Sequence, residues 1–481
     1  MNLEEYSRCD GVALADLVRK REVSPKELVH LFVEAVEKVN PRINAVIEVY
    51  QDRVEGLDDR AIPAGPFAGV PFLMKDIGAG EGGRLQEYGS RLMKGHIVDK
   101  DSFLTTLFKK AGLTLMGRTT TPEFALGVST ESELMGATRN PWNLDTICGG
   151  SSGGSGASIA AGIVPIAHGS DNGGSIRIPA SACGLVGLKP SRGRVTLGPD
   201  IGELWPGMLQ EFVLSRTVRD TALMLNMVSE PTLGDPFIIT QPARPYAQEV
   251  NAPTGHLRIA WTTDSWQPGA SVDSEVVHCV EQVVSECERM GHELINASPV
   301  FDYEEYLRAT CIAWSFGVYA GIELFAAMTG RKISEETLEP VMLSLYNYSK
   351  GLTAADMFMT EFALNKFRRT FGKFFEQYDM LLTPTLVRLP EPIGKYTKMR
   401  TDIDYVGYMR LCDEVRIHPP AANVTGQPAI SLPLGQSQSG LPIGIQFMAK
   451  FGEESALIRL ASSLEKEMPW HDRIPPVHAS R

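Results

Sequence analysis

The 481-residue sequence has little cysteine, no pattern of metal ligands and no excess of positive charge. Its seven cysteines are scattered, odd in number and form no Cys-x-x-Cys pair. Scattered cysteines of this kind are typical of reduced thiols in the cytosol, so we expect a cytoplasmic protein. Neither a zinc-binding Cys/His spacing nor a His-Glu-x-x-His motif occurs, so we expect no metal and no cofactor.

The chain also lacks a continuous apolar run and a targeting signal. No stretch of about 18 apolar residues occurs, so we expect no membrane-spanning helix and no membrane partner. The N-terminal sequence MNLEEYSRCDG has neither a basic nor an apolar region, so we expect no secretory signal. The 46 Lys+Arg and 58 Asp+Glu give a net charge of -12, which repels phosphate backbones, so we expect no nucleic-acid partner.

What the chain does contain is the composition of an ordinary globular protein, with 43% hydrophobic and 22% charged residues. No repeat, low-complexity segment or polar linker divides it, so we expect one large α/β domain over residues 1–481. A strand within 66–77, a helix over 100–111 and a strand over 113–117 alternate, which favours a largely parallel sheet covered by helices. Residues 200–250 show no clear period. Further helices are expected over 24–36, 273–291, most of 303–378 and 453–467, and further strands over 292–297, 380–385, 428–435 and 441–449.

Glycine and serine concentrate between Gly149 and Gly198, where thirteen of 50 residues are glycine, against 45 of 481 in the whole chain. Glycine weakens regular structure, so this density indicates a backbone that approaches a ligand. Two loops carry the pattern, Gly-Gly-Ser-Ser-Gly-Gly-Ser over 149–155 and Gly-Ser-Asp-Asn-Gly-Gly-Ser over 169–175. Such loops supply a serine hydroxyl as nucleophile and backbone N–H groups that face a developing oxyanion.

A serine nucleophile needs a base, and the sequence offers two nearby candidates. His168 is close to both loops, but it lies in an apolar strand, where a structural histidine is the commoner case. Lys75 follows the apolar run Val-Pro-Phe-Leu-Met, so burial would favour its neutral form and make it a workable base. The alternative is a surface lysine paired with Asp76, and composition alone leaves this choice open.

Two other motifs are typical of different functions. The G-x-S-x-G pattern over 149–153 matches the nucleophile elbow of α/β-hydrolases, which needs a preceding strand and a later histidine. Residues 140–148 form a poor strand, and the candidates for the later histidine are His418 and His471. The G-x-G-x-x-G pattern over 78–83 follows a strand, as in dinucleotide-binding proteins, but this short pattern is weak by itself.

Several segments together resemble the amidase signature family. The strongest are GGSSGGS at 149–155, GSDNGGSIRIPASACGLVGLKPSRGRV at 169–195 and GVPFLMKD at 69–76. The chain departs from the family in the second loop, which reads Ser-Asp-Asn where the family more often has Thr-Asp-Thr. Further matches lie at 117–124, 137–143, 378–385 and 423–446.

The resemblance implies a fold, domain boundaries and catalytic residues. It implies a single α/β/α layered domain with a mixed central sheet. The signature core would cover about 66–200 and 378–467, and a variable, substrate-shaping helical section would cover about 200–377. The implied triad has Ser175 as nucleophile, Ser151 after a cis peptide bond as bridge, and Lys75 as base. The implied oxyanion hole consists of the backbone N–H groups of Asn172, Gly173, Gly174 and Ser175.

Four side chains beside these residues are expected to support the loops. Ser152 and Ser155 would cap a helix or make hydrogen bonds within the loops. Asp171 and Arg177 would anchor the second loop through an ion pair or hydrogen bonds, without touching the substrate.

The implied activity is hydrolysis of an amide bond through an acyl-enzyme, and the filled triad positions favour an enzyme over a binding module. Similarity to bacterial amidases of aliphatic amides makes a small linear or cyclic amide the expected partner. Aryl amides, carbamates and esters are alternatives, and an amidotransferase subunit is the runner-up. Cys311 matches a substrate-contacting cysteine of such amidases, and the alternative is a packed helical thiol. A homodimer is one open option for the oligomeric state.

Overall fold

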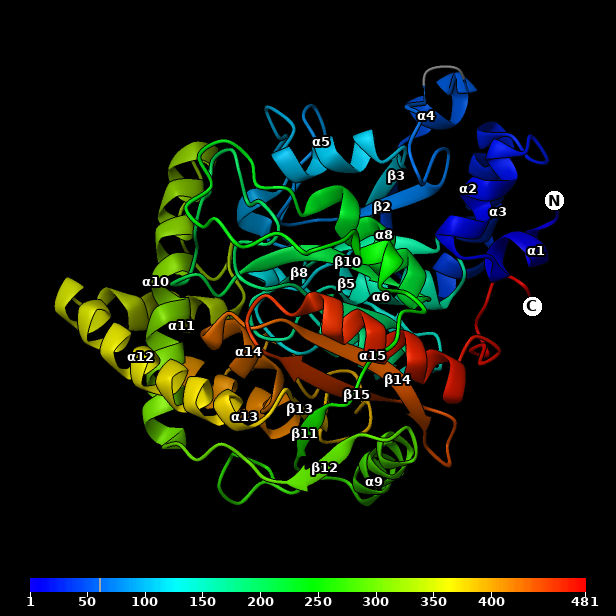
Figure 1. Ribbon diagram of the computed structural model, residues 1–481. Coiled ribbons are helices and arrows are strands. Elements are labelled where there is room, and N and C mark those ends of the chain that lie inside the picture. The colour runs from blue at the N-terminus through cyan, green and yellow to red at the C-terminus, as the bar shows by residue number, and fades with distance from the viewer. Residues whose placement is uncertain (60–61) are drawn as a thin grey trace.

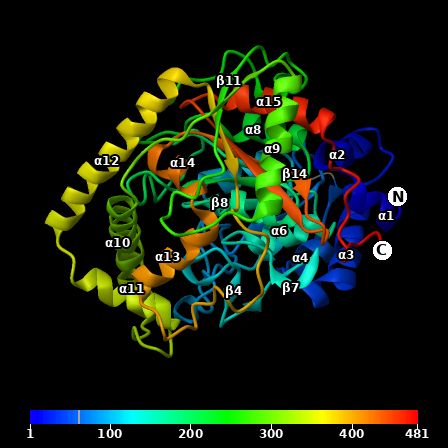
Figure 2. The ribbon, with the colours of Figure 1, turned by 90° about the horizontal axis from the view of Figure 1, so that it is seen from below.

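The computed structural model describes residues 1–59 and 62–481, and one 11-stranded sheet runs through them (Figure 1). Figure 2 shows helices on both sides of this sheet, with α15 and α8 on one side of β14 and with α6 and α13 on the other. The molecule is therefore one α/β domain, as expected. The strands follow in the order β1 (Val46–Val49), β3 (Thr114–Thr119), β2 (Pro71–Lys75), β8 (Ile166–Asp171), β10 (Gln210–Ser215), β9 (Val186–Lys189), β14 (Ala429–Gln436), β15 (Pro442–Ala449), β13 (Met380–Pro384), β11 (Arg258–Trp261) and β12 (Glu293–Asn296).

The sheet is mixed, so the expectation of a largely parallel sheet from the first elements is wrong. Strand β2 is parallel to β3 and β8, and β11 is parallel to β13 and β12. The other neighbours in the sheet are antiparallel. The antiparallel part arises because β14 and β15 form a hairpin and because β10 inserts between β8 and β9.

Most of the expected elements form, and the caps explain several of their ends. Helix α3 (Pro25–Ile43) begins at the expected Ser24-Pro25, where the Ser24 hydroxyl accepts from the Glu27 N–H and Glu27 bonds back to Ser24. Helices α5 (Phe103–Lys110), α9 (Ser274–Arg289) and α15 (Glu454–Glu467) lie where the pattern predicts them.

The region 200–250, which shows no clear period, contains strand β10 and helix α8 (Val218–Val228). All six residues of β10 are buried, so the strand lacks the alternation of apolar and polar residues that reveals a half-exposed strand. The section over 200–377 therefore contributes β10, β11 and β12 to the central sheet, in addition to its helices.

Three long helices stand to one side of the sheet, α10 (Tyr303–Thr329), α11 (Pro340–Lys350) and α12 (Ala354–Gln377) (Figure 1). Together with α13 (Tyr405–Arg416) and α14 (Pro419–Thr425) they enclose a second hydrophobic core, to which strands β11, β13, β14 and β15 also contribute. Helix α10 is the one described helix long and apolar enough to cross a membrane, which the search for continuous apolar runs missed. Here it packs against α11 and α12.

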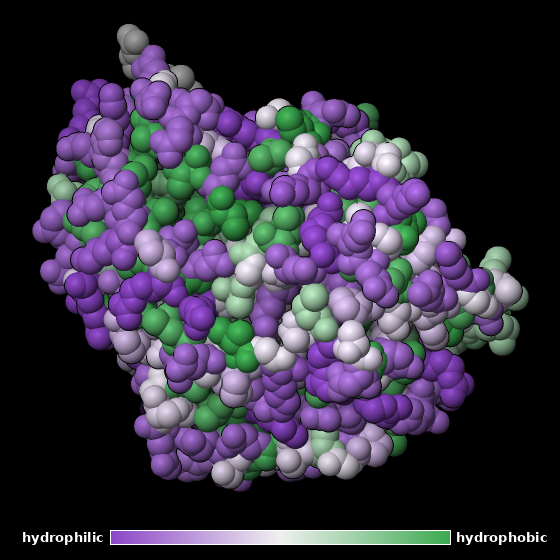
Figure 3. All heavy atoms as spheres, turned by 180° about the vertical axis from the view of Figure 1, so that it is seen from behind, coloured by the Kyte–Doolittle hydropathy of each residue, from purple (hydrophilic) through white to green (hydrophobic). Residues whose placement is uncertain are grey.

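The surface in Figure 3 is mainly hydrophilic, with small hydrophobic areas between polar ones. Hydrophobic atoms protrude at the right of that view, where the N-terminal end of α12 lies. Phe358, Met359 and Phe362 of α12 are exposed by 68%, 63% and 58%. The helical section thus carries more exposed apolar surface than the glycine-rich loops, which are buried almost throughout.

Candidate active site

Lys75 ends strand β2 and is buried, with a relative exposure of 1%. Its amine donates to the hydroxyl of Ser151 at 2.7 Å and to the hydroxyl of Ser170 at 2.9 Å. Burial lowers the pKa of Lys75 to about 7, although the charges of Glu211 and Asp171 oppose this shift. In a large fraction of the molecules at neutral pH, Lys75 therefore carries an uncharged amine, which can accept a proton.

The interpretation of Lys75 as a surface lysine paired with Asp76 is wrong. Asp76 is buried and pairs with Arg118 at 2.7 Å, and it accepts hydrogen bonds from the N–H groups of Glu87 and Gly89. Burial raises the pKa of Asp76 to about 6 against the opposing charge of Arg118. Asp76 thus holds the chain after β2 in place, while Lys75 points to the serines.

Ser151 lies in the loop before α6 (Gly153–Ala160), and the peptide bond between Gly150 and Ser151 is cis. The Ser151 hydroxyl is within 2.7 Å of the Lys75 amine, as the resemblance implied. Ser152 and Ser155 support the loop through their hydroxyls, which donate to the backbone carbonyls of Ser170 and His168 at 3.2 and 2.7 Å. Their expected supporting role is confirmed, through loop hydrogen bonds and not through a side-chain cap of α6.

Ser175 stands between β8 and α7 (Arg177–Cys183) and retains a relative exposure of 7%. Its carbonyl accepts from the N–H of Ser152 at 3.2 Å, so the two serine loops are in direct contact. Among the hydrogen bonds of residues 1–59 and 62–481, the Ser175 hydroxyl has none, and a bond from Ser151 to Ser175 is absent. The structure therefore provides the link from Lys75 to Ser151 and holds the backbone of Ser175 against the neighbouring Ser152, with no hydrogen bond to the Ser175 hydroxyl from the described residues.

The expected oxyanion hole is only partly available. The Gly174 N–H donates to the Asp171 carboxylate at 2.8 Å, so it is not free for an oxyanion. The N–H groups of Asn172, Gly173 and Ser175 have no hydrogen-bond acceptor within the described chain. Gly174 has φ of 108°, and a side chain there would meet Pro419 at 2.7 Å, which explains the glycine.

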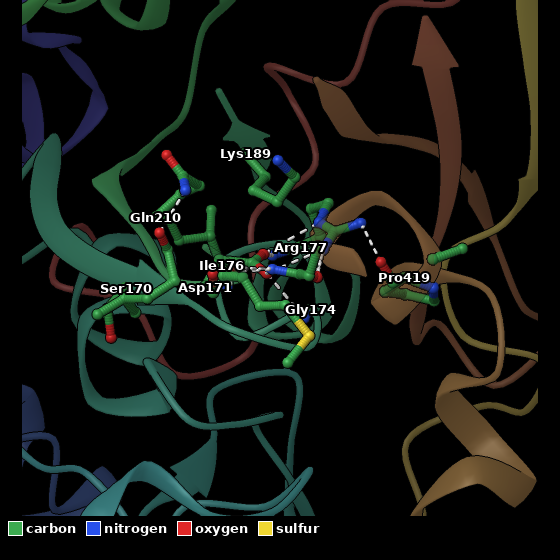
Figure 4. Close-up of polar contacts among 12 residues, drawn as sticks. Ser170, Asp171, Gly174, Ile176, Arg177, Lys189, Gln210 and Pro419 are labelled. Carbon is green, nitrogen blue, oxygen red and sulfur yellow. Dashed lines mark hydrogen bonds and ion pairs between the residues drawn. The ribbon is translucent and has the colours of Figure 1, made fainter. Parts of the chain in front are cut away.

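The second loop is anchored by a buried ion pair, as expected for Asp171 and Arg177. The Arg177 guanidinium donates twice to the Asp171 carboxylate, at 3.0 and 2.8 Å. Figure 4 shows this pair at the centre of the loop, with Arg177 reaching the carbonyl of Pro419 at 2.7 Å. Burial alone would raise the pKa of Asp171, but Arg177 and Asn423 hold it well below its usual range. The side-chain oxygen of Gln446 also accepts a hydrogen bond from Arg177, at 2.7 Å.

His168 has a structural position, as expected, but it contacts the candidate base. Its Nδ1 accepts from the backbone N–H of Lys75 at 3.3 Å, and its Nε2 lies 3.6 Å from the Glu211 carboxylate. The Nε2 makes no hydrogen bond in the described chain. His168 therefore fixes the end of β2. Its ring nitrogens form no hydrogen bond with a serine hydroxyl of either loop, so it is not placed as the base.

Neither competing motif has the surroundings that it needs. A short strand, β7 (Asn143–Ile147), does precede the G-x-S-x-G pattern, although the sequence suggested none, but it pairs with β6 (Arg139–Asn140) in a separate two-stranded sheet and not with the central sheet. His418 donates from its Nε2 to the backbone carbonyl of Asp264 at 3.0 Å, and His471 lies on the surface beside Asp472. Neither histidine forms a hydrogen bond with a described serine of the loops.

The G-x-G-x-x-G segment at 78–83 is not followed by a helix that could receive a pyrophosphate. After it come turns and a bridge between Leu85 and Ile97. Glu81 inside the segment forms ion pairs with Arg53 and Lys109. The segment is a structural loop beside the candidate site.

Cys311 lies in α10 with a relative exposure of 0%. Burial raises the pKa of its thiol, and Tyr405 donates to its backbone carbonyl at 3.0 Å. The surroundings are those of a packed helical thiol, and a substrate contact of Cys311 stays a prediction.

Sequence reasoning gave no role to several residues that hold the site together. Ser170 takes one of the two hydrogen bonds of the Lys75 amine, and its position in the nucleophile loop was the available signal. Asn423 bonds to both the carbonyl and the carboxylate of Asp171 at 2.9 Å. Asn423 and Gln446 belong to segments that match the family, but their long separation from 169–175 hides the contact.

Comparison with known proteins agrees with the geometry. A family model described as amidase matches residues 27–458. The chain is 35% identical to 6-aminohexanoate-cyclic-dimer hydrolase from Pseudomonas sp. (strain NK87) over 475 residues, which is 97% of this chain and 96% of that protein. It is also 35% identical to the putative amidase AmiC of Mycobacterium bovis, over 96% of this chain and 95% of that protein. A solved structure of 6-aminohexanoate cyclic dimer hydrolase complexed with substrate matches with a TM-score of 0.92 and 34% identity, covering 98% of this chain and 99% of that chain.

Proposed function

Because the chain belongs to the amidase signature family and is an amide hydrolase, we propose that it cleaves small linear or cyclic aliphatic amides through an acyl-enzyme on Ser175. Hydrolysis then follows from the protein's own side chains and a water molecule. The proposed triad is Lys75 as base, Ser151 as bridge and Ser175 as nucleophile.

The first step activates the nucleophile. The uncharged Lys75 amine accepts the proton of Ser151 while Ser151 accepts the proton of Ser175. The 2.7 Å hydrogen bond between Lys75 and Ser151 supports the first transfer. The second transfer needs the Ser175 hydroxyl to turn toward Ser151, which its lack of another hydrogen bond permits. Ser175 then attacks the amide carbonyl carbon.

The second step expels the amine. Backbone N–H groups of Asn172, Gly173 and Ser175 stabilise the oxyanion, since these three are the free donors of the loop. The proton returns from Lys75 through Ser151 to the leaving nitrogen, the C–N bond breaks, and the acyl-enzyme remains. Water, activated through the same two groups, attacks the ester and releases the acid and Ser175.

The proposed substrate class comes from the relatives. The hydrolase from Pseudomonas sp. (strain NK87), which is 35% identical to this chain, is named for a cyclic dimer of 6-aminohexanoate, an aliphatic amide. The same fold at TM-score 0.92 holds that relative's substrate. Loops and helices set specificity on a shared fold, so the relatives support the substrate class and the geometry of the serine loops supports the reaction.

The single observation that carries the proposal is a buried lysine amine bonded to Ser151 beside a glycine loop that bears Ser175. We expect a fluorophosphonate probe, which reacts with activated serine hydroxyls, to label Ser175. Peptide mass spectrometry after digestion identifies the labelled residue. The matched control is Ser152→Ala, which removes a neighbouring hydroxyl that does not contact Lys75.

The expected result is labelling of Ser175 in the wild type and in Ser152→Ala, and strong loss of labelling in Lys75→Ala and Ser151→Ala. Labelling of Ser151 or of a serine outside the loops would refute Ser175 as nucleophile. A linear aliphatic amide incubated with the enzyme should release amine and acid in equal amounts, without any partner protein.

A further inference from the structure

An arginine without full hydrogen bonding lies next to the nucleophile loop. Arg416 ends helix α13 and has a relative exposure of 4%. Its side chain reaches Gly173, because a methyl group built on Gly173 would lie 3.2 Å from Nη1 of Arg416. The same methyl group would lie 3.1 Å from the ring of Trp314, which belongs to α10. Two helices of the second core thus place one side chain each against the loop that bears Ser175.

Arg416 uses few of its five N–H groups. The guanidinium stacks on the Trp314 ring, with its central carbon 5.0 Å from the ring centre. Its Nη2 faces the sulfur of Met409 at 3.9 Å, and its Nε lies 3.4 Å from the Asp413 carboxylate without hydrogen-bond geometry. Within the described residues, Nη1 has no hydrogen-bond acceptor, and the fully buried atom of Arg416 without a hydrogen bond is Nε. Trp314 adds a second buried donor, since its indole N–H is also without a partner there.

Buried donors without acceptors are costly, typically by ~1–3 kcal/mol each. Each such donor needs an explanation, and a ligand that supplies the acceptor is one. Nη1 of Arg416 and the ring of Trp314 share one neighbour, Gly173, so a ligand that reaches Nη1 also lies at the nucleophile loop. The ligand must supply oxygen acceptors, because both Arg416 and Trp314 offer only N–H groups.

The charge balance selects the kind of acceptor. Asp413 already lies beside Arg416 and is buried, so the pair as a whole carries no net charge. A carboxylate brought to this place would leave an excess negative charge in a buried site, which is costly. A carbonyl oxygen accepts the same N–H group without changing the charge.

We propose that Arg416, supported by the face of Trp314, binds a second, neutral carbonyl oxygen of the substrate next to the scissile amide. The proposal rests on the proposed function and narrows its substrate class to amides that carry another amide or ester carbonyl. Arg416 is then a specificity-determining residue that takes no part in the proton transfers.

The test compares three matched aliphatic amides. The first has a second amide group, the second has methylene groups in its place, and the third has a terminal carboxylate there. The variant is Arg416→Gln with Asp413→Asn, which removes both charges and leaves no unpaired ion in the core. Asp413→Asn alone is the control, and thermal melting of each variant checks the fold.

For the wild type we expect the diamide to exceed the mono-amide at least tenfold in kcat/KM, mainly through KM. In the double variant this preference should fall to about twofold. Equal losses on both amides would show that Arg416 is only structural, and a larger loss on the carboxylate substrate would show an anion subsite. Either result overturns the proposal.

Calorimetric titration of the diamide into Ser175→Ala, with and without the Arg416 and Asp413 changes, makes the same comparison without turnover. Weaker binding of the diamide alone, by tenfold or more, supports the subsite. Unchanged binding overturns it, even where the wild type proves inactive and the proposed function itself fails.

Discussion

The glycine-serine segment over 149–195 and the helical section over 303–377 lie against each other but are built in opposite ways. In the first, polar groups are buried and bonded to one another, as in the pair of Asp171 and Arg177, or to Lys75 of β2, as Ser151 is. In the second, aromatic and aliphatic side chains make most contacts, as in the stack of Tyr306, Phe367 and Phe371.

The difference indicates which region fixes the distances of the proton relay and which region can change its side chains. A proton relay requires heavy-atom distances near 2.7–3.0 Å, and the segment over 149–195 fixes them through backbone bonds and a buried ion pair. Aromatic packing tolerates substitution, provided that volume is kept. The helical section can therefore alter the pocket without disturbing Lys75, and its effect on the reaction should be confined to side chains that reach the loop, such as Trp314.

The largest effects should come from the proposed catalytic residues. We expect Ser175→Ala and Lys75→Ala each to lower kcat for an aliphatic amide by a factor of ~10³ or more, because nucleophile and base act as one unit. Steady-state kinetics and far-UV circular dichroism measure activity and fold side by side. A folded Lys75→Ala variant with near wild-type rates would contradict the role of Lys75 as base and the contrast between the two regions.

The next effect is on stability and tests the ion pair of the nucleophile loop. Arg177→Leu leaves Asp171 charged and buried, so we expect a loss of ~3–5 kcal/mol in the free energy of unfolding. Arg410→Leu is the matched control, because Arg410 of α13 pairs at 2.7 Å on the surface with Glu304 of the helical section. A surface pair contributes ~0–1 kcal/mol. Urea unfolding gives both values, and similar losses would contradict the contrast between the two regions.

Sequence reasoning succeeded for local features and failed for long-range ones. Strand β2 and its terminal Lys75 could be predicted because an apolar run precedes one cation, and the loops because their glycines are so dense. The contacts of Asp171 with Asn423 join positions 252 residues apart, which no local pattern reveals. Strand β10 was not predicted because it is buried on both faces and so lacks the alternation of apolar and polar residues. Gly174 was expected to serve the oxyanion, but its amide is held by Asp171 only three residues away.

Activity should depend on pH through the Lys75 amine. Burial lowers the pKa of Lys75 to about 7, and the uncharged form is the base, so protonation below that value removes it. We expect kcat/KM to fall about tenfold per pH unit below 7 and to level above it. Glu211→Gln should move the break to lower pH, since the Glu211 charge raises the pKa of Lys75. A rate maximum near pH 5 would contradict an amine base.

The smallest effect concerns Cys311 of the helical section, for which packing and substrate contact predict different results. The thiol is fully buried in α10, so Cys311→Ala removes one buried sulfur and should cost ~1 kcal/mol of stability. We expect kcat/KM for an aliphatic amide to stay within about threefold. Thermal melting and kinetics separate the two quantities. If KM instead rises tenfold while the melting temperature holds, the thiol contacts the substrate, as its match to a substrate-contacting cysteine implies, and the helical section then contributes a contact from within its own core.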